Sequence, residues 1–282
     1  MEIKLVGVVG AGQMGNGIAH VFALSGYEVL LNDISDEGLK RAVATIDKNL
    51  ERQASRGKIT EATRAEAMAR IKTTLVLPDL GACDLIIEAA TEKEAVKRAI
   101  FDALCLKMPK TAMLATNTSS ISITRLGAAT DRPERFIGIH FMNPVPLMQL
   151  VELIRGIATE DETFEASRAL CTKLGKTIAV AEDFPAFIVN RILVPMINEA
   201  ILVFQEGLAS AEDIDAGMRL GCNQPIGPLA LADLIGLDTL LAILQAFYDG
   251  FNDSKYRPAP LLKEMVAAGY LGRKTGRGVY RY

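Results

Sequence analysis

From the start of the chain to about residue 184, short apolar runs alternate with segments of helical periodicity. The run from Leu5 to Val9 leads into a helical segment over residues 16–25, and a second run returns from Glu28 to Leu31. Runs of this length indicate buried strands, and helices between them are typical of a parallel, doubly wound α/β sheet. The other predicted strands are Leu85 to Ala89, Met113 to Thr116, Phe136 to His140 and Leu150 to Leu153.

The pattern changes after Asp183-Phe184-Pro185, where one helical segment follows another without a further strand signal. The first of these helices, over residues 187–205, is apolar on most faces, as expected for a helix buried among neighbours or at a subunit interface. The sequence therefore predicts an α/β domain over residues 1–184 and an all-helical domain over residues 185–282. Because two-fold dimers are the commonest assembly, we expect a homodimer through the helical domain.

A helical-hairpin insertion interrupts the α/β pattern over about residues 37–72. It reads as two long helices joined near residues 55–59, with Thr60 as the N-cap of the second helix. Residues 40–72 hold nine Lys or Arg and four acids. Such charge can simply form a solvated surface, or it can form a basic arm that holds a phosphate-rich part of a substrate.

Composition narrows the possible partners. The chain has 282 residues, of which 50% are hydrophobic, and a formal net charge of −3, which gives no long-range attraction to nucleic acid. Met1-Glu2-Ile3-Lys4 does not resemble a signal peptide, and the most apolar helix carries polar residues such as Arg191 and Glu199, so no membrane span is expected. We expect a cytoplasmic protein. The four cysteines and two histidines are too widely separated to predict a metal site.

The clearest motif is Gly10-Ala11-Gly12-Gln13-Met14-Gly15, which lies between the first strand and the first helix. In this context Gly10 makes a tight turn, Gly12 lets backbone approach a pyrophosphate, and Gly15 lets the helix pack closely. Asp33, at the tip of the second strand, can accept hydrogen bonds from both ribose hydroxyls and would repel a 2′-phosphate. The motif predicts a Rossmann-type domain that binds NAD in preference to NADP, although an adjacent cation could still accommodate a phosphate.

Two residues near the ends of later strands suggest acid–base chemistry. His140 ends the strand that begins at Phe136, and Glu152 interrupts an apolar strand, where a carboxylate is costly to bury without a partner. A pair between them would fix the tautomer of the imidazole and stabilise the imidazolium. Alternatively, His140 is a core histidine and Glu152 a surface acid of an edge strand.

Further polar candidates follow the strand Met113 to Thr116 and open the helical domain. Ser119 and Ser120 would lie beside the nicotinamide, although serine is also what ordinary turns prefer. Asn190 lies within the apolar helix, where a buried amide needs a partner. That partner is a substrate oxygen or a backbone carbonyl.

Besides the glycine motif, several blocks of sequence distributed over nearly the whole chain form a recognisable set. The blocks are Ala115-Thr116-Asn117-Thr118-Ser119-Ser120, Gly138-Ile139-His140-Phe141-Met142-Asn143-Pro144-Val145-Pro146, Leu150-Val151-Glu152, Phe187-Ile188-Val189-Asn190-Arg191 and Leu271-Gly272-Arg273-Lys274-Thr275-Gly276-Arg277-Gly278. Together they resemble the 3-hydroxyacyl-CoA dehydrogenase family, and within it most strongly the stand-alone bacterial 3-hydroxybutyryl-CoA dehydrogenases.

The resemblance implies a role for each matching residue. His140 would be the catalytic base, oriented by Glu152, while Ser119 and Asn190 would hydrogen-bond the reacting substrate oxygen and Ser119 would also touch the cofactor. In the basic arm, Arg56 and Asn49 match coenzyme A contacts, with Asn49 standing where the family has serine. Family positions around NAD correspond to Glu92, Lys97, Asn143 and Lys274.

The implied reaction is the reversible, NAD(H)-dependent interconversion of (S)-3-hydroxybutyryl-CoA and acetoacetyl-CoA. One alternative is a 3-hydroxyacyl-CoA dehydrogenase for a longer or dicarboxylic acyl chain, and another is a gulonate-type NAD dehydrogenase on the same scaffold. The basic arm argues against a sugar acid, which needs no phosphate clamp. A non-catalytic cofactor-binding protein is the remaining class, against which Ser119, His140, Glu152 and Asn190 together argue.

Overall fold

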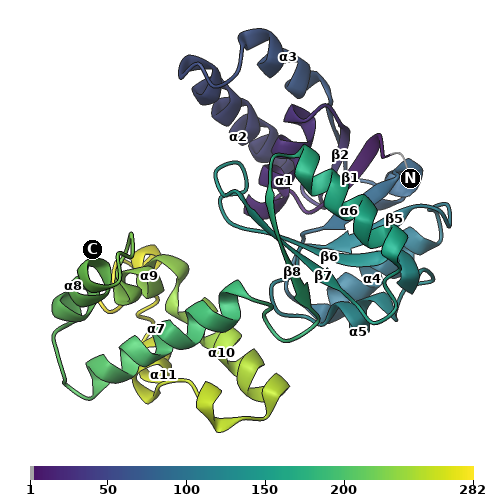
Figure 1. The fold of residues 1–282 in the computed structure, drawn as a ribbon. Helices are drawn as coiled ribbons and strands as arrows, with labels where there is room; N and C mark the ends of the chain where they lie inside the picture. Colours follow the sequence, from purple (N-terminus) through teal and green to yellow (C-terminus); the bar gives the residue numbers. More distant parts are fainter. Residues whose placement is uncertain (1–2) are drawn as a thin grey trace. The chain divides into compact units, whose positions relative to one another are not determined.

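The computed structural model describes residues 3–282 and divides into two compact units, one ending at Phe184 and the other beginning at Pro185 (Figure 1). The first unit is a sheet covered by helices on both faces, and the second contains helices packed on one another. The chain therefore has the predicted fold class, a Rossmann-type α/β domain followed by a helical domain.

The first unit is built on an eight-stranded sheet in the order β3-β2-β1-β4-β5-β6-β7-β8. All six predicted strands begin at the expected residue. Two of them also end at the expected residue, and the other four end within two residues of it. The strands are β1 (Leu5–Val9), β2 (Glu28–Asn32), β3 (Ile71–Thr74), β4 (Leu85–Glu88), β5 (Met113–Thr116), β6 (Phe136–Phe141), β7 (Leu150–Arg155) and β8 (Thr177–Glu182).

The sheet is not entirely parallel, in contrast to the prediction. β6 and β7 pair antiparallel, and β8 runs parallel to β7, so the last two strands oppose the first six. The reason lies in the connection, because a parallel strand needs a crossover of a dozen or more residues whereas residues 142–149 form only a short loop. The reversal places the start of β7 beside the end of β6.

Two strands, β3 and β8, have no counterpart in the predicted set. Both lie at edges of the sheet, where one side of the strand has no neighbour and a run of apolar residues is not required. Their sequences, IKTT and TIAVAE, are accordingly mixed in polarity.

The helical insertion is shorter than predicted, because Lys72 belongs to the edge strand β3. The insertion consists of α2 (Asp36–Ser55) and the short α3 (Glu61–Ala69). Thr60 caps α3 as predicted, accepting a hydrogen bond from the Thr63 amide.

Strand alternation divides the core of this unit between two faces. Val6, Val8 and Ile139 point into the larger cluster, under α1 (Gln13–Leu24), α2 and α6 (Asp161–Lys173). The opposite face carries α4 (Glu94–Cys105) and α5 (Ile123–Gly127) (Figure 1). On this face Phe101 and Phe136 pack edge to face, with ring centroids 5.1 Å apart. Alternation determines which side chains can meet at the site, because neighbours in one strand face opposite sides.

A buried histidine links α1 to the insertion. His20 is 1% exposed, its Nε2 lies 3.1 Å from the Gln53 amide nitrogen in α2, and its Nδ1 has no hydrogen-bond partner among the described residues. Burial, together with the charge of Lys176, lowers the pKa of His20 to about 4. The folded protein thus holds this imidazole neutral.

We expect this residue to make the fold sensitive to acid. An unfolded imidazole takes up its proton near pH 6.5, so the free energy of unfolding falls as the pH drops from about 6.5 toward 4, by about 2 kcal/mol at pH 5. His20→Gln should remove this part of the pH dependence, since glutamine does not titrate and can still hydrogen-bond Gln53. Denaturant unfolding at pH 7 and pH 5 measures the effect, and an equal loss of stability in both proteins would contradict it.

The second unit consists of α7 (Val189–Gln205), α8 (Ala211–Gly221), α9 (Pro228–Ile235), α10 (Leu237–Phe251) and α11 (Pro260–Ala267). Buried residues such as Ile197, Leu240 and Phe247 form its core. The chain's last residues are held by Asp233, whose carboxylate accepts hydrogen bonds from the amides of Val279 and Tyr280.

Among residues 3–282 no single helix has the length and apolar character of a membrane span, although α9 and α10, bent by 97°, meet those criteria as a pair.

Candidate active site

The glycine turn joins β1 to α1, and packing alone requires two of its glycines. Gly10 has φ +97°, and a Cβ there would lie 2.6 Å from the Ala90 Cα. A Cβ on Gly15 would lie 1.7 Å from the Gly10 carbonyl oxygen, so any side chain would push α1 away from the turn. Gly12 differs, because no atom of the described residues lies within 4 Å of the position a Cβ would take.

The start of α1 is suited to an anion. Gly12 is its N-cap, and among the described residues no side chain caps this end and no acidic residue lies in the first turn. Backbone amides at such a terminus bind phosphate oxygens, helped by the helix dipole. The open side of Gly12 and the uncapped helix end fit the pyrophosphate of a dinucleotide.

Asp33 follows β2 and lies directly beside this turn. Its Oδ2 accepts a hydrogen bond from the Ala11 amide at 2.7 Å, and its Oδ1 accepts one from the Ser35 amide at 3.0 Å. A carboxylate oxygen can accept more than one hydrogen bond, so both oxygens retain capacity for ribose hydroxyls. The groove at this position has a volume of about 430 Å³ and is lined by Ala11, Gly12, Gln13, Asn16, Asp33, Ser35, Gly38, Arg41, Ala42 and Thr45.

His140 and Glu152 form a buried pair. They lie directly opposite each other in the antiparallel strands β6 and β7, and His140 Nδ1 is 2.7 Å from Glu152 Oε2. His140 is 7% exposed and Glu152 is fully buried. Because an ionised carboxylate only accepts hydrogen bonds, this contact makes Nδ1 the donor and leaves the basic lone pair on Nε2. The arrangement suits a group that exchanges a proton through Nε2.

The loop after β5 is tied to the strand that carries His140. Asn117 Oδ1 accepts a hydrogen bond of 2.8 Å from the amide of Phe141, the residue after His140. This contact is buried, so it fixes the loop that continues through Thr118 to Ser119. Ser119 therefore follows the end of a strand next to β6, on a segment anchored to β6 itself.

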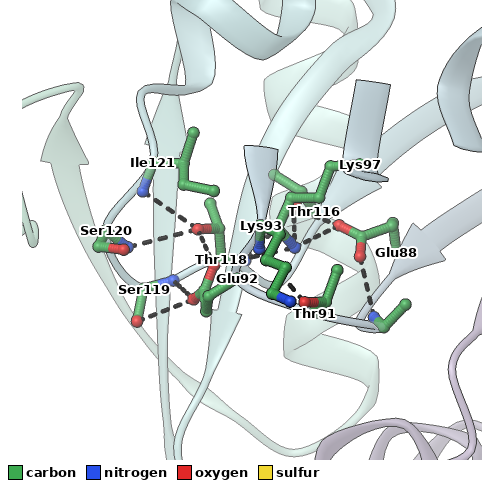
Figure 2. A network of polar contacts seen from close by, with 11 residues as sticks. Glu88, Thr91, Glu92, Lys93, Lys97, Thr116, Thr118, Ser119, Ser120 and Ile121 are labelled. Atoms are coloured by element: carbon green, nitrogen blue, oxygen red, sulfur yellow. Dashed lines mark hydrogen bonds and ion pairs between the residues drawn. The ribbon is translucent and has the colours of Figure 1, made fainter. Parts of the chain in front are cut away.

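Ser119 belongs to a network of polar side chains at the ends of β4 and β5 (Figure 2). Glu92 Oε1 accepts hydrogen bonds from the Ser119 amide at 2.6 Å and from the Ser119 hydroxyl at 2.9 Å. Lys97 lies behind Glu92, with Nζ 3.9 Å from Glu92 Oε2 and 2.5 Å from Glu88 Oε2. Three of the predicted site residues, Ser119, Glu92 and Lys97, are thus brought together.

The remaining predicted residues belong to other elements of the chain. Asn143 is exposed in the loop after β6, and Asn49 and Arg56 lie in α2 and at its C-terminal end. Asn190 is in the first turn of α7, within the predicted helix, and it is half-buried rather than buried as expected. Lys274 is in the second unit as well, where its Nζ is 2.5 Å from Asp238 Oδ1. Burial raises the pKa of Asp238, but the contact with Lys274 and hydrogen bonds from the backbone together lower that pKa below its ordinary value.

Four polar residues of these clusters were not among the predicted site residues: Glu88, Asn117, Thr116 and Thr118. The signal for Glu88 was the one that identified Glu152, namely a single acid in an apolar strand, here Leu85–Glu88. In each strand the polar residue alternates with a core residue, since Ile87, Ala115, Ile139 and Leu153 belong to the larger core cluster. Alternation therefore places Glu88, Thr116, His140 and Glu152 on the same face of the sheet.

Comparison with known proteins agrees with this architecture. Residues 5–184 match the family described as 3-hydroxyacyl-CoA dehydrogenase, NAD binding domain, and residues 187–282 match its C-terminal domain. The chain is 64% identical over 280 residues to a 3-hydroxybutyryl-CoA dehydrogenase of Bradyrhizobium diazoefficiens, covering 99% of this chain and 96% of that protein. It is 42% identical over 281 residues to a 3-hydroxyadipyl-CoA dehydrogenase of Escherichia coli, covering 99% of this chain and 59% of that protein.

A solved structure shows the same fold over the full length. The crystal structure of an (S)-3-hydroxybutyryl-CoA dehydrogenase from Ralstonia eutropha matches with a TM-score of 0.97 and 56% sequence identity, covering 100% of this chain and 99% of that one. The two family matches together span most of the chain. The chain therefore belongs to the 3-hydroxyacyl-CoA dehydrogenase family and is an oxidoreductase with an NAD-binding domain of the Rossmann type.

Proposed function

We propose that this protein catalyses the reversible, NAD(H)-dependent interconversion of (S)-3-hydroxybutyryl-CoA and acetoacetyl-CoA. The observation that carries the proposal is the buried contact of 2.7 Å between His140 Nδ1 and Glu152 Oε2, next to a loop that presents Ser119. Relatives that share 64% and 56% of its sequence are named as dehydrogenases of 3-hydroxybutyryl-CoA, which supports the four-carbon substrate.

The proposed mechanism uses His140 as the acid–base group. In the oxidising direction, His140 Nε2 accepts the proton of the C3 hydroxyl, and the Glu152 carboxylate stabilises the resulting imidazolium. A bound nicotinamide would supply the acceptor for the hydride that leaves C3. In the reducing direction, the His140 imidazolium donates the proton to the carbonyl oxygen. The Ser119 hydroxyl, turning from Glu92 toward the substrate, and the Asn190 amide would donate hydrogen bonds to that oxygen, which orients C3 and favours the developing alkoxide.

NAD is the proposed cofactor rather than NADP. The Asp33 carboxylate lies where ribose hydroxyls are expected, and its negative charge would repel a 2′-phosphate. Arg41 lines the same groove, but its guanidinium lies 3.5 Å from Glu37, which partly neutralises it. Glu92, Lys97, Asn143 and Lys274 are proposed as further residues around the cofactor.

The remaining assignments concern the rest of the substrate and the assembly. We propose that the basic insertion binds the phosphates of coenzyme A through Arg56, with Asn49 nearby in α2.

The second candidate for the substrate is a 3-hydroxyacyl-CoA with a longer or dicarboxylic acyl chain, because the Escherichia coli relative is named for 3-hydroxyadipyl-CoA. A cytoplasmic homodimer through the helical unit is also proposed, and the 67% exposure of Ile192 on α7 supports an interface there.

The direct test compares the rates at which the purified protein oxidises NADH and NADPH with acetoacetyl-CoA. We expect kcat/KM to be at least about tenfold higher with NADH, because replacing hydrogen bonds to Asp33 by charge repulsion costs more than 1.4 kcal/mol. A series of 3-ketoacyl-CoA substrates, including a six-carbon dicarboxylic one, then tests acyl preference. Equal rates with free 3-keto acids would instead favour the gulonate-type alternative.

A further inference from the structure

A buried ion pair lies at the end of β4, on the face of the sheet that α4 covers. Glu88 is fully buried, Lys97 is 1% exposed, and Lys97 Nζ is 2.5 Å from Glu88 Oε2. Burying two charges costs enough desolvation energy that apolar residues of similar size often stabilise a protein more. Stability alone is therefore a weak explanation for a pair at this position.

Every oxygen of Glu88 has a defined partner (Figure 2). Oε2 also accepts a hydrogen bond of 2.9 Å from the Thr116 hydroxyl at the end of β5, and Oε1 accepts one of 2.9 Å from the Ala90 amide. The Ala90 backbone is the surface against which Gly10 packs, since a Cβ on Gly10 would lie 2.6 Å from the Ala90 Cα. Glu88 thus connects the glycine turn with the loop that carries Ser119.

Lys97 links Glu88 to a second carboxylate, that of Glu92. Its ammonium lies 3.9 Å from Glu92 Oε2, which also accepts a hydrogen bond of 2.7 Å from the Thr118 hydroxyl. The Glu92 side chain is 46% exposed, so water competes for its carboxylate and the side chain has room to rotate outward. A cation held on the protein side opposes that rotation, and Glu88 is the charged partner that holds the Lys97 ammonium there.

We infer that Glu88 is a positioning residue for the reaction: it holds the Lys97 ammonium beside Glu92 and thereby fixes the carboxylate that anchors the Ser119 backbone amide, so that the Ser119 hydroxyl lies where it can turn to the reacting oxygen. The inference rests on the proposed role of Ser119 at the reacting oxygen. Glu88 is fully buried, so its effect on the reaction passes through Lys97, Glu92 and Ser119.

The test replaces the pair by a neutral one, Glu88→Gln/Lys97→Met. The glutamine carbonyl can still accept the hydrogen bond from the Ala90 amide, methionine fills the volume of the lysine stem, and no charge is left buried without a partner. We expect thermal unfolding close to that of the wild type but a kcat for acetoacetyl-CoA reduction that is roughly 10- to 100-fold lower, because misorienting one hydrogen bond in the transition state has about this effect. Wild-type kcat in the neutral-pair variant would overturn the inference.

A second measurement separates positioning from a general structural role. If the pair acts through Ser119, adding Glu88→Gln/Lys97→Met to Ser119→Ala should lower kcat no further than Ser119→Ala alone. Multiplicative losses in the combined variant would overturn the inference. Asp102→Asn, at an exposed position of the same helix, is the matched control and should leave all parameters unchanged.

Failure of the inference can be told apart from failure of the proposed function. A neutral-pair variant with normal kcat, alongside an inactive His140→Gln variant, would reject only the positioning role. Normal activity in both Ser119→Ala and His140→Gln would reject the proposed function, and the inference with it. Should the neutral-pair variant not fold, Glu88→Asp keeps the two buried charges paired but shortens the side chain that holds the Lys97 ammonium, and wild-type kcat in that variant would overturn the inference.

Discussion

Replacing His140 with glutamine should lower kcat for the reduction of acetoacetyl-CoA by roughly 10²- to 10⁴-fold, the range that a positioned general acid or base contributes. Glutamine cannot supply the proton at the reacting oxygen, but its amide can still donate a hydrogen bond to the buried Glu152 carboxylate. We therefore expect the fold and the dissociation constant for NADH to change little. Steady-state kinetics, thermal unfolding and NADH fluorescence titration measure the three properties separately.

The partner of His140 provides the control for this result. Glu152→Gln keeps the volume of the side chain and a hydrogen-bonding group but removes the charge that selects the tautomer and stabilises the imidazolium. It should lower kcat as well, and the double variant should be no slower than His140→Gln alone, because residues that act as a unit give non-additive losses. If His140→Gln retained wild-type kcat, the imidazole would not be the proton carrier.

The strands that could be predicted from the sequence are those whose burial requires a continuous run of apolar residues. Central strands such as β1 and β5 are apolar on both faces, and their ends agree with the apolar runs. The edge strands β3 and β8 pair on one side only, so their polar residues resemble those of loops. The orientation of β7 depends on the length of one loop rather than on the strand's own residues, which is why the apolar pattern did not reveal it.

The site shows the same division between local and long-range information. The glycine turn and Asp33 are adjacent through a single β-α-β unit, so their spacing in sequence predicts their proximity. The pairing of His140 with Glu152 depends on strand register, which places them opposite each other across β6 and β7. Glu88 and Lys97 are nine residues apart and meet only after α4 has packed on the sheet. No local pattern encodes such a contact, although a lone acid in an apolar strand signals that some partner exists.

The glycine turn allows binding and folding to be tested independently. Gly10 and Gly15 have no space for a Cβ, so replacing either would disturb the fold as well as the site. Gly12 has φ −66°, which alanine adopts readily, and no atom of the described residues lies within 4 Å of an added Cβ. Gly12→Ala should therefore fold with the stability of the wild type.

The same substitution should weaken NADH binding strongly. The added methyl group would occupy the space through which the proposed pyrophosphate approaches the first amides of α1, so we expect the dissociation constant to rise on the order of 100-fold, about 2.7 kcal/mol. Gly217→Ala in α8, where an added Cβ also meets no atom of the described residues, is the matched control. It should leave NADH binding unchanged and, because alanine favours a helix interior over glycine, slightly raise the free energy of unfolding. Fluorescence titration with NADH and denaturant unfolding of both variants measure these effects. An unchanged dissociation constant for Gly12→Ala would show that the dinucleotide does not approach along this turn, and the assignment of the anion site to α1 would be wrong.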